Sequence, residues 1–295
     1  MLMHWQTTRF QIELSSPQVM GIVNVTPDSF SDGGEHASQS AAMAWCDKLV
    51  KEGANILDIG GESTRPGAPP VPQDEELARV LPIVRHAVTL GVPVSVDTYK
   101  PAVMQAALDL GADIINDVWA LRWPGSEDLR TGMDVVREHP NCGMCLMHMH
   151  RDPQTMQVTP MQGDAVPQVL LFLEHLLQEM SGLGVDKARI CIDPGIGFGK
   201  TVAQNFALLA RQQELIALGY PVLAGWSRKS SLVAVTQHSL SDVATLDVRE
   251  RLVPSVMAAL LAVQNGAHIV RVHDVKETVQ ALKVWAAMQQ QKASE

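Results

Sequence analysis

The chain is short of basic residues relative to acidic ones, of cysteine, and of long apolar runs. Its 23 lysine and arginine residues stand against 32 aspartate and glutamate residues, which gives a formal net charge of −9. Because a nucleic-acid-binding protein neutralises phosphates with a basic face, this balance argues against nucleic acid as a partner. An anionic ligand would need a local basic cluster.

No run of about 18 apolar residues occurs, so no membrane-spanning helix and no membrane partner are predicted. The first residues include Gln6, Arg9 and Glu13 and contain no apolar signal-peptide core. We therefore expect a cytoplasmic protein. Its few cysteines are expected to stay reduced, without a structural disulfide; they are Cys46, Cys142, Cys145 and Cys191.

The apolar sequence that is present is enough for a large core. Of 295 residues, 46% are hydrophobic and 19% are charged. A single (β/α)8 barrel takes about 250 residues, so the length fits this fold. We expect one domain over residues 1–295, with its core at about 19–288.

A weak internal repeat marks joints between helices and strands. The pattern Gly-Ala-X-Ile occurs at 53–56, 111–114 and 266–269, each time between a helix-like segment and an apolar, strand-like one. Glycine at such a joint ends a helix in a left-handed cap. Variants with Gly91, Gly184 and Gly219 precede further strands.

Reading outward from these joints gives eight apolar strands alternating with amphipathic helices. The strands are predicted at 19–25, 56–59, 94–96, 114–116, 144–147, 190–192, 222–224 and 269–272. The helices are predicted at 41–52, 75–90, 101–110, 166–183, 206–218, 256–265 and 275–288. This alternation predicts a parallel sheet. We favour a closed (β/α)8 TIM barrel in a single domain; a doubly wound open sheet is the alternative.

Polar residues follow most of these strands. Asp193 ends an apolar strand before a glycine-rich turn, and Asp97, Asn116 and the pair Arg271 and His273 stand at corresponding places. The carboxyl ends of barrel strands meet at one face, where active sites of this fold lie. We therefore expect one site built from several strands.

Other candidates are weaker when taken alone. Asn24 is an amide in a strand that is otherwise apolar and needs partners. Thr64 and Arg65 lie in a loop at 60–73 that a solvated turn would explain equally. Lys229 follows the seventh strand, where barrels often bind anions, although a surface basic pair is the alternative. For Arg271 the alternative is pairing with an acid such as Asp274.

The segment from Cys142 to His150 contains two cysteines and two histidines within nine residues. Strand alternation places Cys145, Met147 and Met149 on one side and His148 with His150 on the other. A zinc site needs paired cysteines on a turn and histidines at a wider spacing. Zinc is therefore disfavoured.

Taken together, the motifs resemble those of the dihydropteroate synthase family from about residue 19 to the last helix. Six segments carry the resemblance: 20–34 (MGIVNVTPDSFSDGG), 60–67 (GGESTRPG), 95–101 (SVDTYKP), 193–200 (DPGIGFGK), 227–230 (SRKS) and 271–275 (RVHDV). The resemblance implies a barrel enzyme of folate synthesis. Such an enzyme joins 4-aminobenzoate to 6-hydroxymethyl-7,8-dihydropterin pyrophosphate and releases pyrophosphate, with Mg2+ bound.

By this resemblance, Asp193, Asn116 and Lys229 bind the pterin. A carboxylate suits the amino-pyrimidine edge because it can accept two parallel N–H bonds. Asp97 is expected to face the cation that develops on the pterin methylene. The expected catalytic residues are Asp97, Lys229, Arg271 and His273.

The departing pyrophosphate is expected to meet Arg271, His273 and a magnesium ion near Asn24. The aromatic amine of the second substrate is neutral at pH 7 and can attack the cation without a strong base, so we name no catalytic base. Its pocket is expected to contain Arg65, Pro66, Phe198 and Ser230. Thr64 is expected to contact the substrate from the loop after the second strand. Sulfonamides are expected to compete there.

Some positions depart from the family's pattern. Arg151 and Pro254 stand where glycine is frequent, and Val233 stands where glycine often follows Lys-Ser. The resemblance also suggests a homodimer formed through the last helices. Two other functions stay open: a methyltetrahydrofolate-corrinoid methyltransferase domain, which has no use for Arg65 or Lys229, and a pterin-binding paralogue without catalysis.

Overall fold

The computed structural model describes residues 3–26, 34–65, 67–125, 130–236 and 248–292. Within these ranges, eight parallel strands are hydrogen-bonded in the order β8-β7-β6-β5-β4-β3-β10-β9. A parallel bridge between Ile192 and Val222 joins the two ends of this order, so the sheet closes. The predicted barrel is confirmed. Its strands are β3 (Gln18–Asn24), β4 (Ile56–Gly60), β5 (Val94–Asp97), β6 (Ile114–Asp117), β7 (Gly143–Met147), β8 (Ile190–Asp193), β9 (Leu223–Ala224) and β10 (Ile269–Val272).

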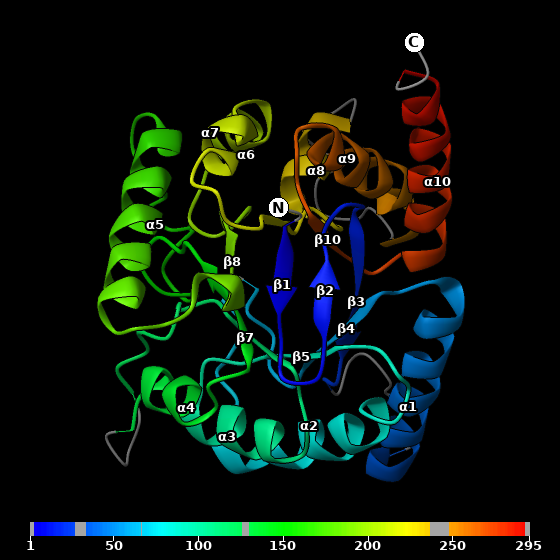
Figure 1. Ribbon diagram of the computed structural model, residues 1–295, viewed down its shortest axis with the longest axis vertical. Coiled ribbons are helices and arrows are strands. Elements are labelled where there is room, and N and C mark those ends of the chain that lie inside the picture. Colours follow the sequence, from blue (N-terminus) through cyan, green and yellow to red (C-terminus); the bar gives the residue numbers. More distant parts are fainter. Residues whose placement is uncertain (1–2, 27–33, 66, 126–129, 237–247, 293–295) are drawn as a thin grey trace.

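The helices lie around the ring of strands (Figure 1). The helix expected at 206–218 is divided into two, which meet at Arg211, and α4 lies where no helix is predicted. The described helices are α1 (Gly34–Glu52), α2 (Gln73–Ala87), α3 (Pro101–Asp109), α4 (Gly132–Glu138), α5 (Ala165–Gly182), α6 (Val202–Ala210), α7 (Gln212–Ile216), α8 (Ser230–Thr236), α9 (Leu252–Gln264) and α10 (Val275–Lys292), with 3-10 turns η2 (Lys187–Arg189) and η4 (Val248–Arg251).

The glycines of the repeat end helices as expected. Gly53, Gly111 and Gly266 have φ angles of 102°, 96° and 95°, in the left-handed region that glycine adopts without strain. Each is followed within a few residues by a barrel strand. These joints therefore place the starts of β4, β6 and β10.

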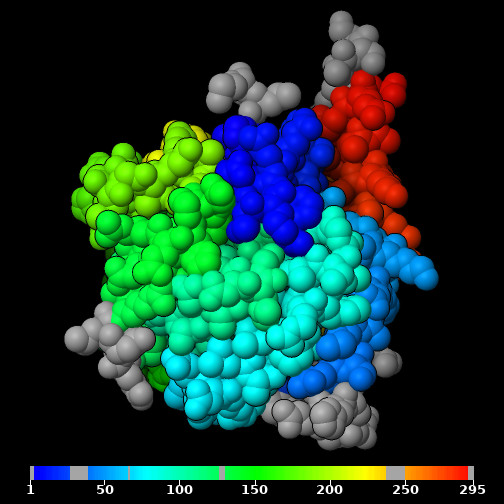
Figure 2. Space-filling view, turned by 60° about the horizontal axis from the view of Figure 1, so that its bottom comes forward, coloured from blue at the N-terminus to red at the C-terminus, as the bar shows by residue number. Residues whose placement is uncertain are grey.

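A two-stranded hairpin closes the amino end of the barrel. It consists of β1 (His4–Gln6) and β2 (Gln11–Glu13), and no strand is predicted for this segment. Its side chains Trp5, Ile12 and Leu14 form one buried cluster with the first inward-facing residues of the barrel strands. Figure 2 shows the amino-terminal segment, in dark blue, lying across this face of the molecule. Strand residues in the cluster are Met20, Ile56, Ile114, Cys145, Cys191, Leu223 and Ile269.

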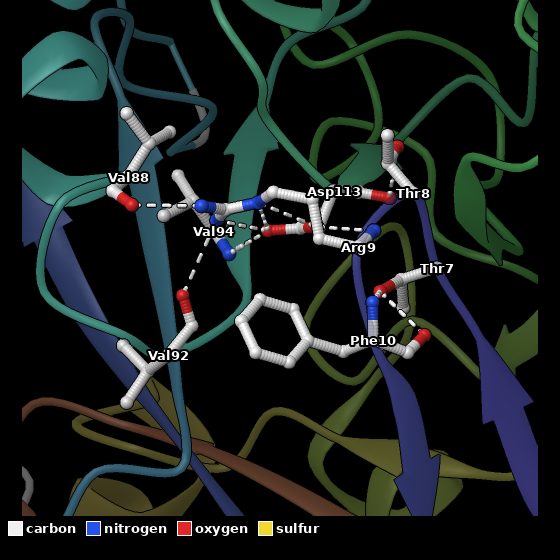
Figure 3. Close-up of polar contacts among 8 residues, drawn as sticks. All are labelled: Thr7, Thr8, Arg9, Phe10, Val88, Val92, Val94 and Asp113. Atoms are coloured by element: carbon white, nitrogen blue, oxygen red, sulfur yellow. Dashed lines mark hydrogen bonds and ion pairs between the residues drawn. The ribbon is translucent and has the colours of Figure 1, made fainter.

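The hairpin turn is fixed to the barrel by an ion pair with a buried carboxylate (Figure 3). Arg9 lies 2.6 Å from the carboxylate of Asp113, which is fully buried, and also donates to the carbonyl of Val88 at 2.7 Å. The same carboxylate accepts the N–H groups of Arg9 and Val94. Both carboxylate oxygens of Asp113 are thus occupied within the protein.

A second, larger cluster fills the space between the strands and the helices and includes Ile59, Val96, Ile115 and Leu146. All four cysteines are buried and carry free thiols. Among the helices of the described residues, none combines the length and apolar character needed to cross a membrane.

Candidate active site

The inward-facing side chains of the barrel form two layers of opposite character. At the amino end they are apolar, and on four strands the residue two positions further along is polar or charged. Because side chains of a strand alternate between faces, residues i and i+2 point into the same space. The pairs are Ile56 and Asp58, Ile114 and Asn116, Cys191 and Asp193, and Ile269 and Arg271.

Asp58 is the centre of the polar layer. It is fully buried on β4, and the Nε of Arg271 from β10 lies 2.6 Å from its Oδ2. The Ser95 hydroxyl donates to it at 2.6 Å, and the Asn116 amide donates to both of its oxygens at 3.3 and 3.4 Å. One carboxylate therefore aligns side chains from three other strands.

Arg271 also pairs with Asp97 of β5, its Nη2 lying 2.7 Å from Oδ2. Burial raises the pKa of Asp97, while the guanidinium of Arg271 opposes that rise and Asp58 adds to it. The alternative pairing of Arg271 with Asp274 does not occur, since Asp274 pairs with Arg228 at 2.7 Å. Arg271 thus brings two carboxylates together inside the barrel.

Asp193 ends β8 with one oxygen occupied and the other open. Its Oδ1 accepts the N–H of Gly195 at 2.7 Å, and its Oδ2 accepts no hydrogen bond from any residue that the structure describes. Burial raises the pKa of this carboxyl, and the Gly195 N–H and Lys229 lower it. Gly195 has a φ of 69°, and a Cβ there would lie 1.9 Å from the carbonyl oxygen of His148. Only glycine fits this turn.

Lys229 and Phe198 lie together near Asp193. The ammonium of Lys229 lies 4.4 Å from the centre of the Phe198 ring. Burial lowers the pKa of Lys229 to about 8, against the attraction of Asp193, and the charges of Arg271 and Arg65 lower it further. A cation and an aromatic wall thus border the open carboxylate oxygen.

His273 follows β10 and is held by Ser227. The Ser227 hydroxyl accepts the backbone N–H of His273 at 3.1 Å and lies 2.9 Å from its Nδ1. Burial lowers the pKa of His273 well below its ordinary value, assisted by Arg228 and Arg271. A lowered pKa favours the neutral ring, in which one nitrogen donates and the other accepts, and the direction of the Ser227–Nδ1 bond depends on which tautomer is present.

The remaining predicted residues lie on loops and strand ends. Thr64 is half-buried and Arg65 exposed on the loop after β4, while Pro66 lies outside the described residues. Asn24 is half-buried at the end of β3, opposite Gly60 of β4. Ser230 is exposed at the start of α8. Arg65 is close enough for its charge to lower the pKa of His273 as well as that of Lys229, although burial is the main cause.

Comparison with known proteins identifies the family of this chain. The model of the pterin binding enzyme family matches residues 20–273. The dihydropteroate synthase of Neisseria meningitidis serogroup B is 46% identical over 289 residues, which cover 96% of this chain and 97% of that protein. The chain belongs to the dihydropteroate synthase family. The family expected from the sequence motifs is thus confirmed.

Solved structures of the dihydropteroate synthase family share the whole fold. The Xanthomonas albilineans dihydropteroate synthase with 4-aminobenzoic acid has a TM-score of 0.88 and 46% identity, covering 98% of this chain and 99% of that one. The Burkholderia cenocepacia dihydropteroate synthase complexed with 7,8-dihydropteroate has a TM-score of 0.85 and 45% identity, covering 100% and 99%.

The departures from the dihydropteroate synthase pattern have local structural consequences. Arg151 has a φ of 65°, a conformation that favours the glycine frequent at this position. Pro254 lies in the first turn of α9, where a missing N–H removes no helical hydrogen bond. Val233 is buried within α8.

The segment from Cys142 to His150 alternates as predicted. Met147 and Met149 belong to an apolar cluster at the carboxyl end of the barrel, with Phe198 packed against it. His148 points the other way, its ring 4.9 Å from Phe172 of α5. Among the residues that the structure describes, no group of three His, Cys, Asp or Glu side chains could hold a metal ion.

Two residues of the site are absent from the sequence predictions. Asp58 carries a charge within the apolar run of β4, which is the same signal that singled out Asn24, and it stands two residues after an inward-facing isoleucine. Ser227 lies in the quoted SRKS segment, but its bond to His273 joins positions 46 residues apart. The spacing in the sequence gives no sign of that contact.

Proposed function

We propose that this chain joins 4-aminobenzoate to 6-hydroxymethyl-7,8-dihydropterin pyrophosphate, forming 7,8-dihydropteroate and releasing pyrophosphate. The observation that carries the proposal is that one end of the barrel holds both an open carboxylate oxygen on the buried residue Asp193 and Arg271, which bridges two further carboxylates. The first suits the hydrogen-bonding edge of a pterin, and the second suits a leaving group that departs as an anion.

The pterin would lie across the polar layer. Asp193 has the free acceptor that the amino-pyrimidine edge needs, and Asn116, held by Asp58, adds an amide from the neighbouring side. Lys229 adds a cation beside Phe198. Since each of these side chains is held by its surroundings before substrate arrives, little ordering is needed on binding.

Loss of pyrophosphate leaves a cation on the pterin methylene and negative charge on the leaving group. Asp97 lies beside Arg271 and supplies a carboxylate to the cation. Arg271 and His273 would hold the leaving group, because the guanidinium presents several donors and a neutral imidazole presents one, and neither needs to give up a proton. The aromatic amine then attacks the cation in an SN1-like displacement.

A magnesium ion fits the donor at the end of β3. Asn24 makes no hydrogen bond with its side chain to the described residues, and an amide oxygen is a hard ligand of the kind that magnesium takes. The described residues offer no denser ligand set. Such an ion would be held by Asn24, water and pyrophosphate oxygens, and would stabilise negative charge on the leaving group.

The second substrate would lie between Phe198 and the loop after β4. Its carboxylate needs a positive field, which Arg65 and the start of α8 at Ser230 provide. Thr64 and Pro66 complete the proposed pocket. Sulfonamides would compete here as analogues of the aromatic acid.

The direct test is turnover of the purified protein with both substrates and magnesium, with and without a chelator. Metal-dependent formation of dihydropteroate is the expected result. Pterin binding without any product would instead indicate a non-catalytic pterin-binding protein or a methyltransferase domain.

Exchange of Asp193 for asparagine tests the pterin assignment. The amide lacks the charge and the second acceptor, so the Kd for the pterin substrate should rise by about 100-fold, as for loss of a charged hydrogen-bonded contact. Calorimetric titration measures this, with folding checked by thermal unfolding. An unchanged Kd would remove Asp193 from the site.

A homodimer is supported by an apolar stripe on α9. Val253, Met257 and Leu261 are exposed by 74%, 54% and 39% and recur every four residues, so they share one side of the helix. We expect a dimer in light scattering, which Met257→Lys should dissociate. In the cell, we expect the protein to be cytoplasmic.

A further inference from the structure

Both ends of the loop after β4 meet at one buried lysine. The segment from Gly61 to Pro72 leads from β4 to α2 and carries Thr64 and Arg65. Lys100, which precedes α3, is only 4% exposed and lies between the two ends of this segment. It comes from the SVDTYKP segment, three residues after Asp97.

The ammonium of Lys100 has three N–H donors, and each has an acceptor. It donates to Oε2 of Glu62 at 2.5 Å, to the carbonyl of Val71 at 2.7 Å, and to the carboxylate of Glu76 on α2. Glu62 begins the loop and Val71 ends it. One side chain at the start of α3 therefore joins both ends of the loop to α2, the helix that follows the loop.

Glu62 strengthens this junction. Its Oε2 accepts the backbone N–H of Val71 at 3.1 Å, and its Oε1 accepts the hydroxyl of Tyr99 at 2.7 Å. Arg79 of α2 donates to the carbonyl of Gly61 at 2.8 Å and so holds the preceding residue. The loop is thus closed at its base, while Arg65 at its far side is exposed.

The burial of these charges argues for a geometric role. The side chains of Lys100, Glu62 and Glu76 are exposed by 6%, 8% and 1%. Burial raises the pKa of Glu76, and Lys100 opposes the rise. Buried ion pairs contribute little net stability compared with apolar packing, but they specify geometry where direction matters. The hydrogen bonds of this cluster include none with Asp58, Asn116 or Asp193 among the described residues.

We infer that Lys100 and Glu62 are positioning residues for the second substrate: they clamp the base of the loop so that Thr64 and Arg65 face the aromatic acid. The inference rests on the proposed function. Asp97 and Lys100 belong to one sequence segment, SVDTYKP. By this inference Asp97 serves the pterin substrate and Lys100 serves the aromatic acid, so one segment contributes to two subsites.

The test compares Lys100→Met with Lys48→Met, a control lysine on the surface of α1 whose side chain is 55% exposed. The first readout is the KM for each substrate. The KM for 4-aminobenzoate should rise about tenfold or more in Lys100→Met, the size expected for loss of charged hydrogen bonds, while the KM for the pterin substrate changes less than about twofold. The control should match the parent chain.

A second readout does not depend on turnover. Hydrogen exchange of the Val71 N–H and its neighbours should accelerate in Lys100→Met, and exchange of residues 195–200 should not. Tyr99→Phe is the milder variant if Lys100→Met does not fold, since it removes one hydrogen bond and keeps the ring 5.0 Å from Trp123. It should raise the KM for 4-aminobenzoate alone, by a smaller factor.

The outcomes separate the inference from the proposed function. An inactive parent chain would overturn the function itself. An active parent chain in which both KM values rise together, or in which neither moves, would overturn the positioning role, as would unchanged exchange at Val71.

Discussion

The two ends of the barrel use buried charge in opposite ways. At the amino end, Arg9 and Asp113 pair with each other and with backbone groups, and the hairpin above them covers an apolar layer (Figure 3). At the carboxyl end, Arg271 bridges Asp58 and Asp97, and Asp193 keeps one oxygen without a partner among the described residues.

This contrast distinguishes a stabilising charge from a functional one in this fold. Where all donors and acceptors are used inside the protein, nothing is left for a ligand. Where several carboxylates are buried around one guanidinium and an acceptor has no partner, their burial destabilises the folded state. A bound ligand can offset that destabilisation. Substitutions at the carboxyl end are therefore expected to lower activity, and substitutions at the amino end are expected to lower stability.

The largest effect is expected for Arg271→Gln, which should lower kcat/KM by about 1,000-fold, as for the loss of a donor to developing charge. It also leaves Asp58 and Asp97 without their cation. Steady-state kinetics and thermal unfolding measure the two consequences. Turnover near the parent level would contradict a role in holding the leaving group.

The stability of Arg271→Gln should also depend on pH in a defined direction. Asp97 already has a raised pKa because of burial, and removal of the guanidinium raises it further. The folded state then binds the proton more tightly than the unfolded chain does. Stability should be greatest below the ordinary pKa of aspartate and decrease as the pH rises through the raised value.

At the opposite end, Arg9→Met should destabilise without inactivating. It leaves the fully buried carboxylate of Asp113 unpaired, so the free energy of unfolding should fall by about 2–4 kcal/mol. Arg211→Met, whose partner Asp164 is exposed, is the matched control and should destabilise the protein much less. A loss of kcat/KM beyond about twofold in Arg9→Met would contradict the expectation that charges at the amino end serve stability and not catalysis.

A smaller effect concerns the charge of Lys229. Because burial lowers its pKa to about 8, the ammonium is lost as the pH rises through that value. The kcat/KM for the pterin substrate should then fall about tenfold per pH unit above it. Lys229→Arg keeps its charge and should remove this decline from the pH–rate profile; a decline that persists would assign it to another group.

The smallest effect is expected at Arg151. Glycine relieves the left-handed conformation there, so Arg151→Gly should raise the free energy of unfolding by about 1 kcal/mol, measured by denaturant titration. The matched exchange Arg137→Gly, inside α4, should destabilise by about the same amount. Equal effects in both variants would argue against strain at Arg151.

Much of the fold could be predicted because its signals are local. Left-handed glycines such as Gly53 and Gly266 end helices next to apolar runs, and both features are visible in short windows of sequence. The hairpin was missed because β1 and β2 have three residues each and only Trp5 and Ile12 face the barrel. Two short strands carry almost no periodic signal.

The candidate site was predictable where a polar residue ends a strand, as at Asp97, Asn116 and Asp193. Asp58 lies inside an apolar strand and not at its end, so a rule that looks for polar residues at strand ends does not predict it. The clamp of Lys100 and Glu62 could not be predicted, because 38 residues separate its partners and each is unremarkable in its own segment.

The order of the elements, their glycine joints and the chemical types available at each strand end follow from the amino-acid sequence, because these depend on neighbours a few residues away. Which groups pair depends on how the chain folds in three dimensions. Arg271 has Asp274 three residues away in the chain, yet it binds Asp58 and Asp97, because closure of the barrel turns alternate side chains inward and leaves Asp274 to Arg228.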